Sequence, residues 1–455
     1  MPKKILITSL LVTQWLFATS GASAQSLKEV VQETLTTNPD VQIAISQRNA
    51  VEQEMEQAKA GFFPSADINV GHGWETSNNS TTRDRGDGAS NLDRSEAEII
   101  IRQLLFDGFA TESEVDRQRA RVNSRAYTTF GTSEVIALKA IEAYLDVLRQ
   151  QKLVTFAQEN LAAHQKTHDQ ISKRSERGVG RQSDAQQTLG RLALARTNLM
   201  AEENNLRDAL ISFERIVGKK PEGLTEPAGI EQQLPATLED AIAMALANHP
   251  TLMSAEADVE AARMQQKAAR ALFYPRFHVE VSGSENDDLD GIPGPNRDGQ
   301  IMVRGRYNLK GGRDMARREE TAYLLNEAVE VKNNTRRQVI ESIQLSWHAY
   351  QTAKLQLENF RIHVDASQQA RDAYKKQFNI GQRTLLDLLD SENELFTARI
   401  DHANSINTLS FATYRILAGT GQLLQTLEVA PPEEIATVSK DQPVYKLPAL
   451  YNILK

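Results

Sequence analysis

The stretch LKEVVQETLTTNPDVQIAISQRNAVEQEMEQAKAGFFPSADINV at residues 27–70 is matched without a gap by LEDAIAMALANHPTLMSAEADVEAARMQQKAARALFYPRFHVEV at residues 238–281. Apolar residues fall at the same places in both copies. Each copy also has a proline at an equivalent position and ends in an aromatic–proline pair, Phe63–Pro64 or Tyr274–Pro275. A chain that carries one plan twice is built from two copies of one structural unit. The sequence therefore predicts an internal twofold repeat.

The repeat continues beyond this block. Gly108 corresponds to Gly312, Tyr144 to Tyr350, and Gly218 to Gly419. Between the copies lies a segment with three prolines, which is typical of a linker. We therefore expect a first repeat at 25–218, a linker at 219–237, a second repeat at 238–421 and a C-terminal tail at 422–455.

The first residues predict export. Lys3 and Lys4 precede an apolar stretch that is shorter than the ~20 residues a membrane span needs, and Ala22-Ser23-Ala24 is a small-residue cleavage site. Residues 1–24 are thus expected to be a signal peptide. The chain has no cysteine, so it has no disulfide and no thiol-based metal site. Its formal net charge of -8 argues against nucleic acid as a partner.

Most of the remaining chain predicts long amphipathic helices. Residues 109–177 contain no proline, and an apolar stripe typical of a coiled-coil seam runs through them. This helix should break at a turn about 178–184 and return to Gly218. The second copy should do the same, with a helix at 313–377, a turn about 378–384 and a return to Gly419. One leading helix, 27–61 or 238–272, should precede each β-hairpin.

Between the leading and long helices, the apolar period changes from helical to alternating. Ile68, Val70 and Trp74 alternate with polar residues or glycine, and so do Ile301 and Val303. This pattern predicts strands with one apolar and one polar face. We expect one hairpin about 65–106 and another about 276–310. Such strands suit a soluble hairpin packed on helices as well as a transmembrane barrel, and four strands cannot close a barrel alone.

The repeated leading helix, Leu105-Phe106-Asp107-Gly108-Phe109 and GQRTLLDLLD at 381–390 resemble the TolC family of outer-membrane channel proteins. The resemblance extends from about 27 to 421. It implies a mixed, mainly α fold and a homotrimer. Long coiled-coil helices would form a periplasmic α-barrel, and four β-strands per chain would contribute to a 12-stranded β-barrel in the lipid of the outer membrane of a Gram-negative bacterium.

The resemblance also assigns roles at the two helical turns. Asp387 and Asp390 would narrow the pore entrance. Ser183, Asp184, Phe378 and Arg383 would tether the coils, although Phe378 stands where a tyrosine is expected. Gly178, Gly180 and Gly381 are the turn glycines. Without the resemblance, Asp387 and Asp390 are explained more simply as carboxylates that compensate a helix dipole just after a turn.

No residue pattern predicts an enzyme, a cofactor or a metal site. His164 and His168 have a helical i, i+4 spacing, but no third ligand accompanies them, so we expect a solvated helix face. The implied function is a passive conduit that works with a periplasmic adaptor protein and an inner-membrane ABC transporter or proton-driven pump.

The cargo is less constrained than the conduit. The sequence from Gly178 to Leu199 is similar to the type I secretion branch, which favours a large protein such as an adhesin as the cargo. Small-molecule or multidrug efflux is the alternative. A periplasmic adaptor or a coiled-coil structural protein is the alternative of a different class, but an adaptor would have one hairpin rather than two copies.

Overall fold

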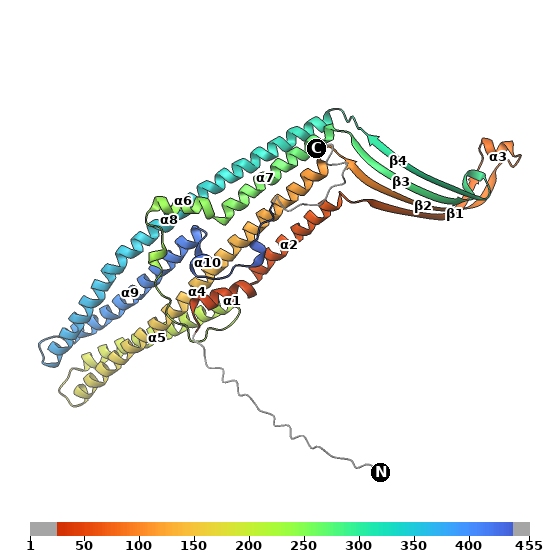
Figure 1. The fold of residues 1–455 in the computed structure, drawn as a ribbon. Helices are drawn as coiled ribbons and strands as arrows, with labels where there is room; N and C mark the ends of the chain where they lie inside the picture. The colour runs from red at the N-terminus through yellow and green to blue at the C-terminus, as the bar shows by residue number, and fades with distance from the viewer. Residues whose placement is uncertain (1–24, 440–455) are drawn as a thin grey trace, which may run out of the picture.

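The computed structural model describes residues 25–439 (Figure 1). The predicted signal peptide at 1–24 and residues 440–455 of the predicted tail lie outside the described residues. The described chain is mainly helical and has one four-stranded antiparallel sheet, which confirms the predicted fold class. The sheet extends away from one end of the helices (Figure 1).

Each repeat begins with two helices. They are α1 (Leu27–Thr37) and α2 (Pro39–Ala60) in the first copy, and α6 (Leu238–Asn248) and α7 (Pro250–Arg270) in the second. The prediction of one leading helix per copy is therefore wrong. Asn38 and His249 each precede a proline, which disfavours helical backbone at the residue before it, and both are extended, with ψ of 127° and 119°. Each then caps the helix that the proline begins.

The strands follow these helices. The first hairpin consists of β1 (Ser65–Ser77) and β2 (Ser90–Phe106), with the short helix α3 (Ser80–Asp84) between them. The second consists of β3 (Arg276–Asp287) and β4 (Pro295–Arg306). The strand order is β1-β2-β3-β4, so β1 and β4 are the edges of the sheet. The register sets Arg102 opposite Glu280, and a bulge interrupts β2 between Leu104 and Phe106.

Two long helical hairpins complete the repeats. The first consists of α4 (Ala110–Glu176) and α5 (Gln182–Val217), and the second of α8 (Gly312–Asn379) and α9 (Leu385–Gly419). The contacts between helices define a wall in which α4 is central. On one side α4 packs on α2 and α5, and on the other it packs on α7 and α9, which in turn contact α8. The edges of the wall are thus α2 and α5 on one side and α8 on the other.

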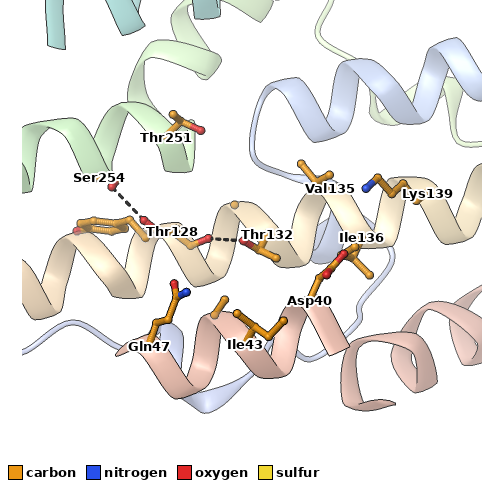
Figure 2. A pocket seen from close by; sticks show the side chains of 13 residues that line it. Asp40, Ile43, Gln47, Thr128, Thr132, Val135, Ile136, Lys139, Thr251 and Ser254 are labelled. Carbon is orange, nitrogen blue, oxygen red and sulfur yellow. Dashed lines mark hydrogen bonds between the residues drawn. The ribbon is translucent and has the colours of Figure 1, made fainter. Parts of the chain in front are cut away.

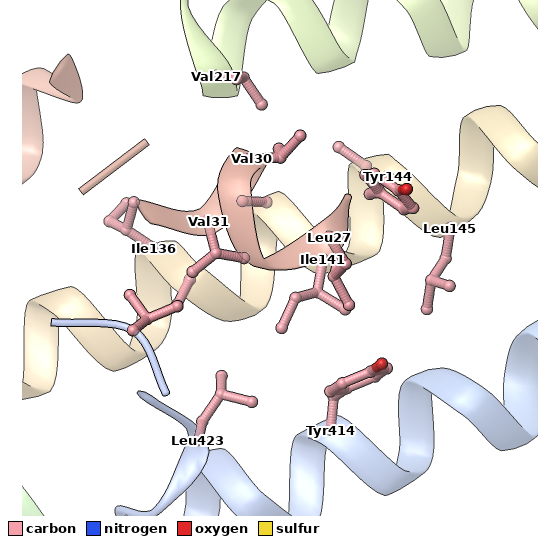
Figure 3. Close-up of a cluster of buried hydrophobic side chains, with 14 of the residues drawn as sticks. Leu27, Val30, Val31, Ile136, Ile141, Tyr144, Leu145, Val217, Tyr414 and Leu423 are labelled. Carbon is pink, nitrogen blue, oxygen red and sulfur yellow. The ribbon is translucent and has the colours of Figure 1, made fainter. Parts of the chain in front are cut away.

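The main apolar core lies midway along the helices, where α1, α4, α5 and α9 meet (Figure 3). Tyr144 is its largest fully buried side chain. The Tyr144 hydroxyl lies 2.8 Å from the Gln25 carbonyl oxygen and accepts a hydrogen bond of 3.0 Å from the Thr225 N–H. These bonds satisfy the buried hydroxyl and attach the linker to the helices.

After α9 the chain forms the short helix α10 (Leu423–Thr426) and then runs back along the helices. Its start is held by Glu134 of α4, whose carboxylate accepts hydrogen bonds of 3.2 Å from the N–H groups of Leu423 and Leu424. Further on, Asn123 of α4 exchanges two hydrogen bonds with the backbone of Val438. The described part of the tail is therefore packed on α4. Among the described residues, no helix is both long enough and apolar enough to cross a membrane.

Candidate functional site at the two ends of the molecule

One face of the sheet is apolar and bare. Ile68, Val70 and Trp74 of β1 are 72%, 80% and 86% exposed, and Ile301 of β4 is 78% exposed. Side chains at every second position of paired strands share one face, so these residues form a continuous surface. A soluble monomer rarely leaves so large an apolar surface open to water. This face requires an apolar environment or a partner.

The other face of the sheet carries charge. Glu280 of β3 accepts hydrogen bonds from Arg102 of β2 at 3.1 Å and from Arg304 of β4 at 2.6 Å. Arg102 also bonds to Asp67 of β1. A chain of ion pairs thus crosses all four strands. Strands of 12 to 17 residues exceed the ~10 that a tilted strand needs to cross a bilayer. This sheet has the two-faced pattern of a transmembrane barrel segment.

At the opposite end lie the two helical turns. In the first, Gly178 has a φ of 72°, a conformation that side chains with a Cβ resist, and a Cβ on Gly180 would stand 3.0 Å from the backbone nitrogen of Ser175. Ser183 is exposed, and its hydroxyl reaches Asp184 at 3.4 Å. Arg181, the residue before α5, makes no capping bond through its side chain. This turn is formed mainly by its backbone.

The second turn is tied by side chains. Gly381 has a φ of 79°. Thr384 and Asp387 form a capping box, with the Asp387 N–H donating to the Thr384 hydroxyl at 3.2 Å and the Thr384 N–H donating to Asp387 at 3.3 Å. The hydrogen bond from the Thr384 hydroxyl lowers the pKa of Asp387, so this carboxylate stays ionised. Asp387 therefore caps its own helix, as the dipole interpretation expects.

Arg383 contacts its own hairpin, whereas Phe378 also reaches the first hairpin. The Arg383 guanidinium lies over the Tyr374 ring at 4.0 Å and donates to Gln377 at 3.0 Å. Phe378 packs beside an apolar cluster that contains Ile171 of α4 and Leu389 of α9. Within the described chain, no hydrogen bond or ion pair joins Asp184 to Arg383. Of the predicted tether residues, the structure brings Phe378 to the interface between the hairpins and leaves Asp184 and Arg383 apart.

The bond that does join the edge helix α5 to α9 involves a residue that the sequence did not single out. Arg191 of α5 donates to Asp390 at 2.7 Å. The sequence offers one signal for Arg191. It follows the first turn at nearly the same distance along the chain as Asp390 follows the second turn, and the repeat could have revealed this correspondence.

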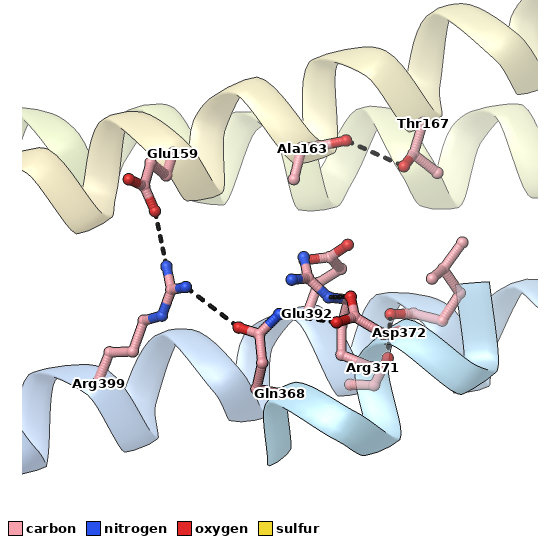
Figure 4. Close-up of polar contacts among 10 residues, drawn as sticks. Glu159, Ala163, Thr167, Gln368, Arg371, Asp372, Glu392 and Arg399 are labelled. Atoms are coloured by element: carbon pink, nitrogen blue, oxygen red, sulfur yellow. Dashed lines mark hydrogen bonds and ion pairs between the residues drawn. The ribbon is translucent and has the colours of Figure 1, made fainter. Parts of the chain in front are cut away.

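Further along, Figure 4 shows polar contacts that join α4, α8 and α9. Arg399 of α9 donates to Glu159 of α4 at 2.6 Å and to Gln368 of α8 at 3.1 Å. Arg371 of α8 bonds to the buried Glu392 of α9 at 3.0 Å. The bond from Arg399 to Glu159 ties the second hairpin to α4, and the other two bonds tie α8 to α9 within that hairpin.

The predicted solvated face is wrong for His164, which is only 4% exposed. Burial, and then the charge of Arg191, lower its pKa, so it stays neutral. His168 lies 2.9 Å from the Thr188 hydroxyl. Both histidines face α5 because the hairpin folds back over them. No cluster of potential metal ligands occurs among the residues the structure describes.

A groove of about 470 Å³ lies between α2, α4 and α7 (Figure 2). Its hydroxyls bond to one another or to the backbone, with Ser254 3.2 Å from Thr128 and Thr132 donating to the Thr128 carbonyl at 3.0 Å. Ile43 and Val135 on its rim are about half exposed. The groove is an open seam between helices.

A bare apolar sheet at one end and long helical hairpins at the other define an outer-membrane channel subunit. The family model described as outer membrane efflux protein matches residues 30–219 and 241–421. The chain belongs to this family, whose members are channels rather than enzymes, and it is a protein of the Gram-negative outer membrane that extends into the periplasm. The two matched segments correspond to the two repeats.

Among curated relatives, the outer membrane efflux protein BepC of Brucella suis is 27% identical over 75% of this chain and 76% of its own length. The alkaline protease secretion protein AprF of Pseudomonas aeruginosa is 23% identical over 93% and 88%. TolC of Escherichia coli is 20% identical over 85% and 80%, which confirms the predicted resemblance.

Solved structures share the fold. The Campylobacter jejuni CmeC outer membrane channel aligns with a TM-score of 0.75 and 14% identity over 87% of this chain and 86% of its own. VceC of Vibrio cholerae aligns with a TM-score of 0.72 and 18% identity over 87% and 96%.

Proposed function

We propose that three copies of this chain form a channel-tunnel, the exit duct of a tripartite export system. The single observation that carries the proposal is that the sheet and the helical wall both end in open edges, and that these edges lie on the same two sides of the protomer. Strand β1 directly follows α2, and β4 directly precedes α8. One side of the protomer is therefore β1 with α2 and α5, and the other is β4 with α8.

A ring of three copies would close both parts at once. Pairing β4 of one copy with β1 of the next makes twelve strands, above the minimum of ~8 for a bacterial barrel. The apolar face then meets lipid and the charged face lines the lumen. In the same ring α8 of one copy lies along α2 and α5 of the next. The exposed apolar residues of these edge helices, among them Leu355, Ile362, Met200 and Ile211, would be covered.

The ring also gives the turn residues their proposed roles. Asp387 and Asp390 would each be present three times around one axis, and clustered carboxylates make a cation-attracting constriction. Asp184 lies in the first turn of the edge helix α5, and Arg383 stacks on Tyr374 of the edge helix α8. Their tether would therefore join neighbouring copies, whereas the bond between Arg191 and Asp390 holds each copy closed within itself. Gating would separate these contacts.

Type I secretion of a large protein, such as an adhesin, is the cargo we propose. The likeness to AprF, which is named for protease secretion and matches along most of both chains, supports it. Small-molecule efflux is the second candidate, favoured by the likeness to BepC, which is named as an efflux protein. An inner-membrane ABC transporter or proton-driven pump and a periplasmic adaptor would be the partners.

Fractionation and conductance test the channel. Detergent extraction of the outer membrane should yield a heat-modifiable trimer that forms pores in planar bilayers. A soluble periplasmic monomer would instead support the adaptor or structural alternative. For the gate, replacing Asp184 and Arg383 together by alanine should raise the single-channel conductance. Glu260→Ala/Arg263→Ala, which removes an exposed ion pair of α7, is the matched control. Conductance equal to that of the parent would refute the tether assignment.

A further inference from the structure

The arginines of the sheet fall into two groups. The described strands contain six, and four of them pair with a carboxylate: Arg94 with Glu75, Arg102 and Arg304 with Glu280, and Arg297 with Glu285. The other two, Arg276 and Arg306, have no ion-pair partner among the described residues. Both are exposed.

These two arginines are also direct partners in the register. Arg276 is the first residue of β3, Arg306 is the last residue of β4, and their Cα atoms pair. Like charges directly opposite on one face destabilise a sheet. Arg276 lies four residues before Glu280, and Arg306 lies two residues after Arg304. Both therefore project from the charged face rather than the apolar one.

The positive charge continues into the helix that follows. Lys310, Arg313 and Arg318 are exposed and, within the described chain, have no ion-pair partner. Lys310 and Arg313 line a hollow of about 630 Å³ together with Arg317, Asp314 and Glu320, of which Arg317 and Glu320 form an ion pair. The corresponding junction of the first repeat is different. There Asp107 begins α4 by accepting hydrogen bonds from the N–H groups of Ala110 at 3.0 Å and Thr111 at 2.9 Å. The cationic junction thus belongs to the second repeat alone.

We propose that Arg276 and Arg306 form an anion-binding collar at the base of the barrel lumen. The collar rests on the trimeric channel proposed above, in which it would hold six guanidinium groups. Guanidinium binds carboxylate and phosphate through paired hydrogen bonds, so the ligands are anionic solutes or acidic segments of the cargo. Outward-facing lipid headgroups are disfavoured because the pair shares the face of Asp67, Arg102 and Glu280.

Ion selectivity tests the collar. The aspartates at the second helical turn are neutralised first, so that they no longer select ions. In an Asp387→Asn/Asp390→Asn background, the reversal potential in a KCl gradient gives the chloride-to-potassium permeability ratio. Arg276→Gln/Arg306→Gln should lower this ratio about threefold or more, because the lumen loses six positive charges. Arg276→Lys/Arg306→Lys should keep it. Arg263→Gln/Arg361→Gln, which removes two helix arginines, is the matched control and should leave it unchanged.

An unchanged ratio in a conducting Arg276→Gln/Arg306→Gln channel would overturn the collar. Absence of current from the parent protein would refute the channel instead, and a second measurement then decides on the collar. Calorimetric titration of the detergent-extracted protein with inorganic pyrophosphate should show binding that the glutamine variant weakens at least about tenfold. Equal binding by the two proteins would overturn the proposal.

Discussion

The two long helices occupy equivalent places in the repeat and have almost the same length, yet their surroundings differ. Helix α4 has 26 buried residues among 67, whereas α8 has 8 among 68. Helix α4 is enclosed by neighbours on both sides, and α8 has neighbours on one side only. Two helices that are equivalent in the repeat are thus a central helix and an edge helix of the wall.

The difference indicates where a second copy sits. On α8, the buried Ile343 and Tyr350 face α6 and α9. Leu355 and Ile362, which are 70% and 54% exposed, lie about 100–140° further around the helix at 100° per residue. A helix with two separate apolar faces can be packed on both of them, as a helix in the middle of a wall is. We infer that α8 becomes enclosed, as α4 already is, when the next copy packs on it.

The largest expected effect comes from putting a charge on this bare face. Leu355→Glu should cost about 3–5 kcal/mol at each interface, because it buries an unpaired carboxylate, and the trimer should dissociate. Lys354→Glu places the same group one residue earlier, about 100° away, and should leave the trimer intact. Sedimentation of the detergent-extracted proteins measures both. A stable Leu355→Glu trimer would mean that this face of α8 stays open in the assembly.

A second expected effect concerns Glu134, the buried carboxylate of α4. The equivalent residue of α8 in the repeat is Ile340. Burial raises the pKa of Glu134 to about 7 from 4.5, although the N–H groups of Leu424 and Leu423 oppose this. Between pH 4.5 and 7 the folded chain holds a proton that the unfolded chain has released. Glu134 therefore contributes stability below pH 4.5 that is lost as the pH rises to about 7, on the order of 3 kcal/mol per chain.

Glu134→Gln stays neutral and should remove this part of the pH dependence. The melting temperature of the parent should fall more between pH 5 and pH 8 than that of Glu134→Gln, and Glu142→Gln, on the same helix, serves as the control. Equal slopes for the parent and Glu134→Gln would show that the carboxylate is hydrated in the folded protein.

The smallest expected effect compares the two turns. Thr384→Ala removes the capping box of α9 and should cost about 1 kcal/mol locally. Arg181→Ala removes the corresponding side chain of the first turn, which caps nothing, and should change little. Hydrogen exchange at the first turns of α9 and α5 reports on both. Equal loss of protection in the two variants would mean that the turns are held alike.

The spacing of the apolar residues and the turn residues sufficed to predict most of the fold. Each long helix and each strand has an apolar spacing of its own type, and the second repeat shows the same spacing as the first. The breaks at Asn38 and His249 were missed although each precedes a proline, because the apolar period continues across them. Glu134 could not be predicted, since its partners lie far away in the chain, and for Arg191 the repeat offered the only signal. The roles of Asp184 and Arg383 stay predictions, because they depend on contacts between copies.

The cysteine-free chain allows one direct test of the proposed ring. In the proposed ring, the Asp184→Cys/Arg383→Cys variant brings one new thiol of each copy beside the other new thiol of the next copy. Oxidation in outer membranes should therefore link neighbouring copies, and a non-reducing gel should show a ladder that ends at a covalent trimer. Each single variant should stay monomeric on the same gel. A double variant that stays monomeric after oxidation, while both of its thiols react with maleimide, would contradict the ring.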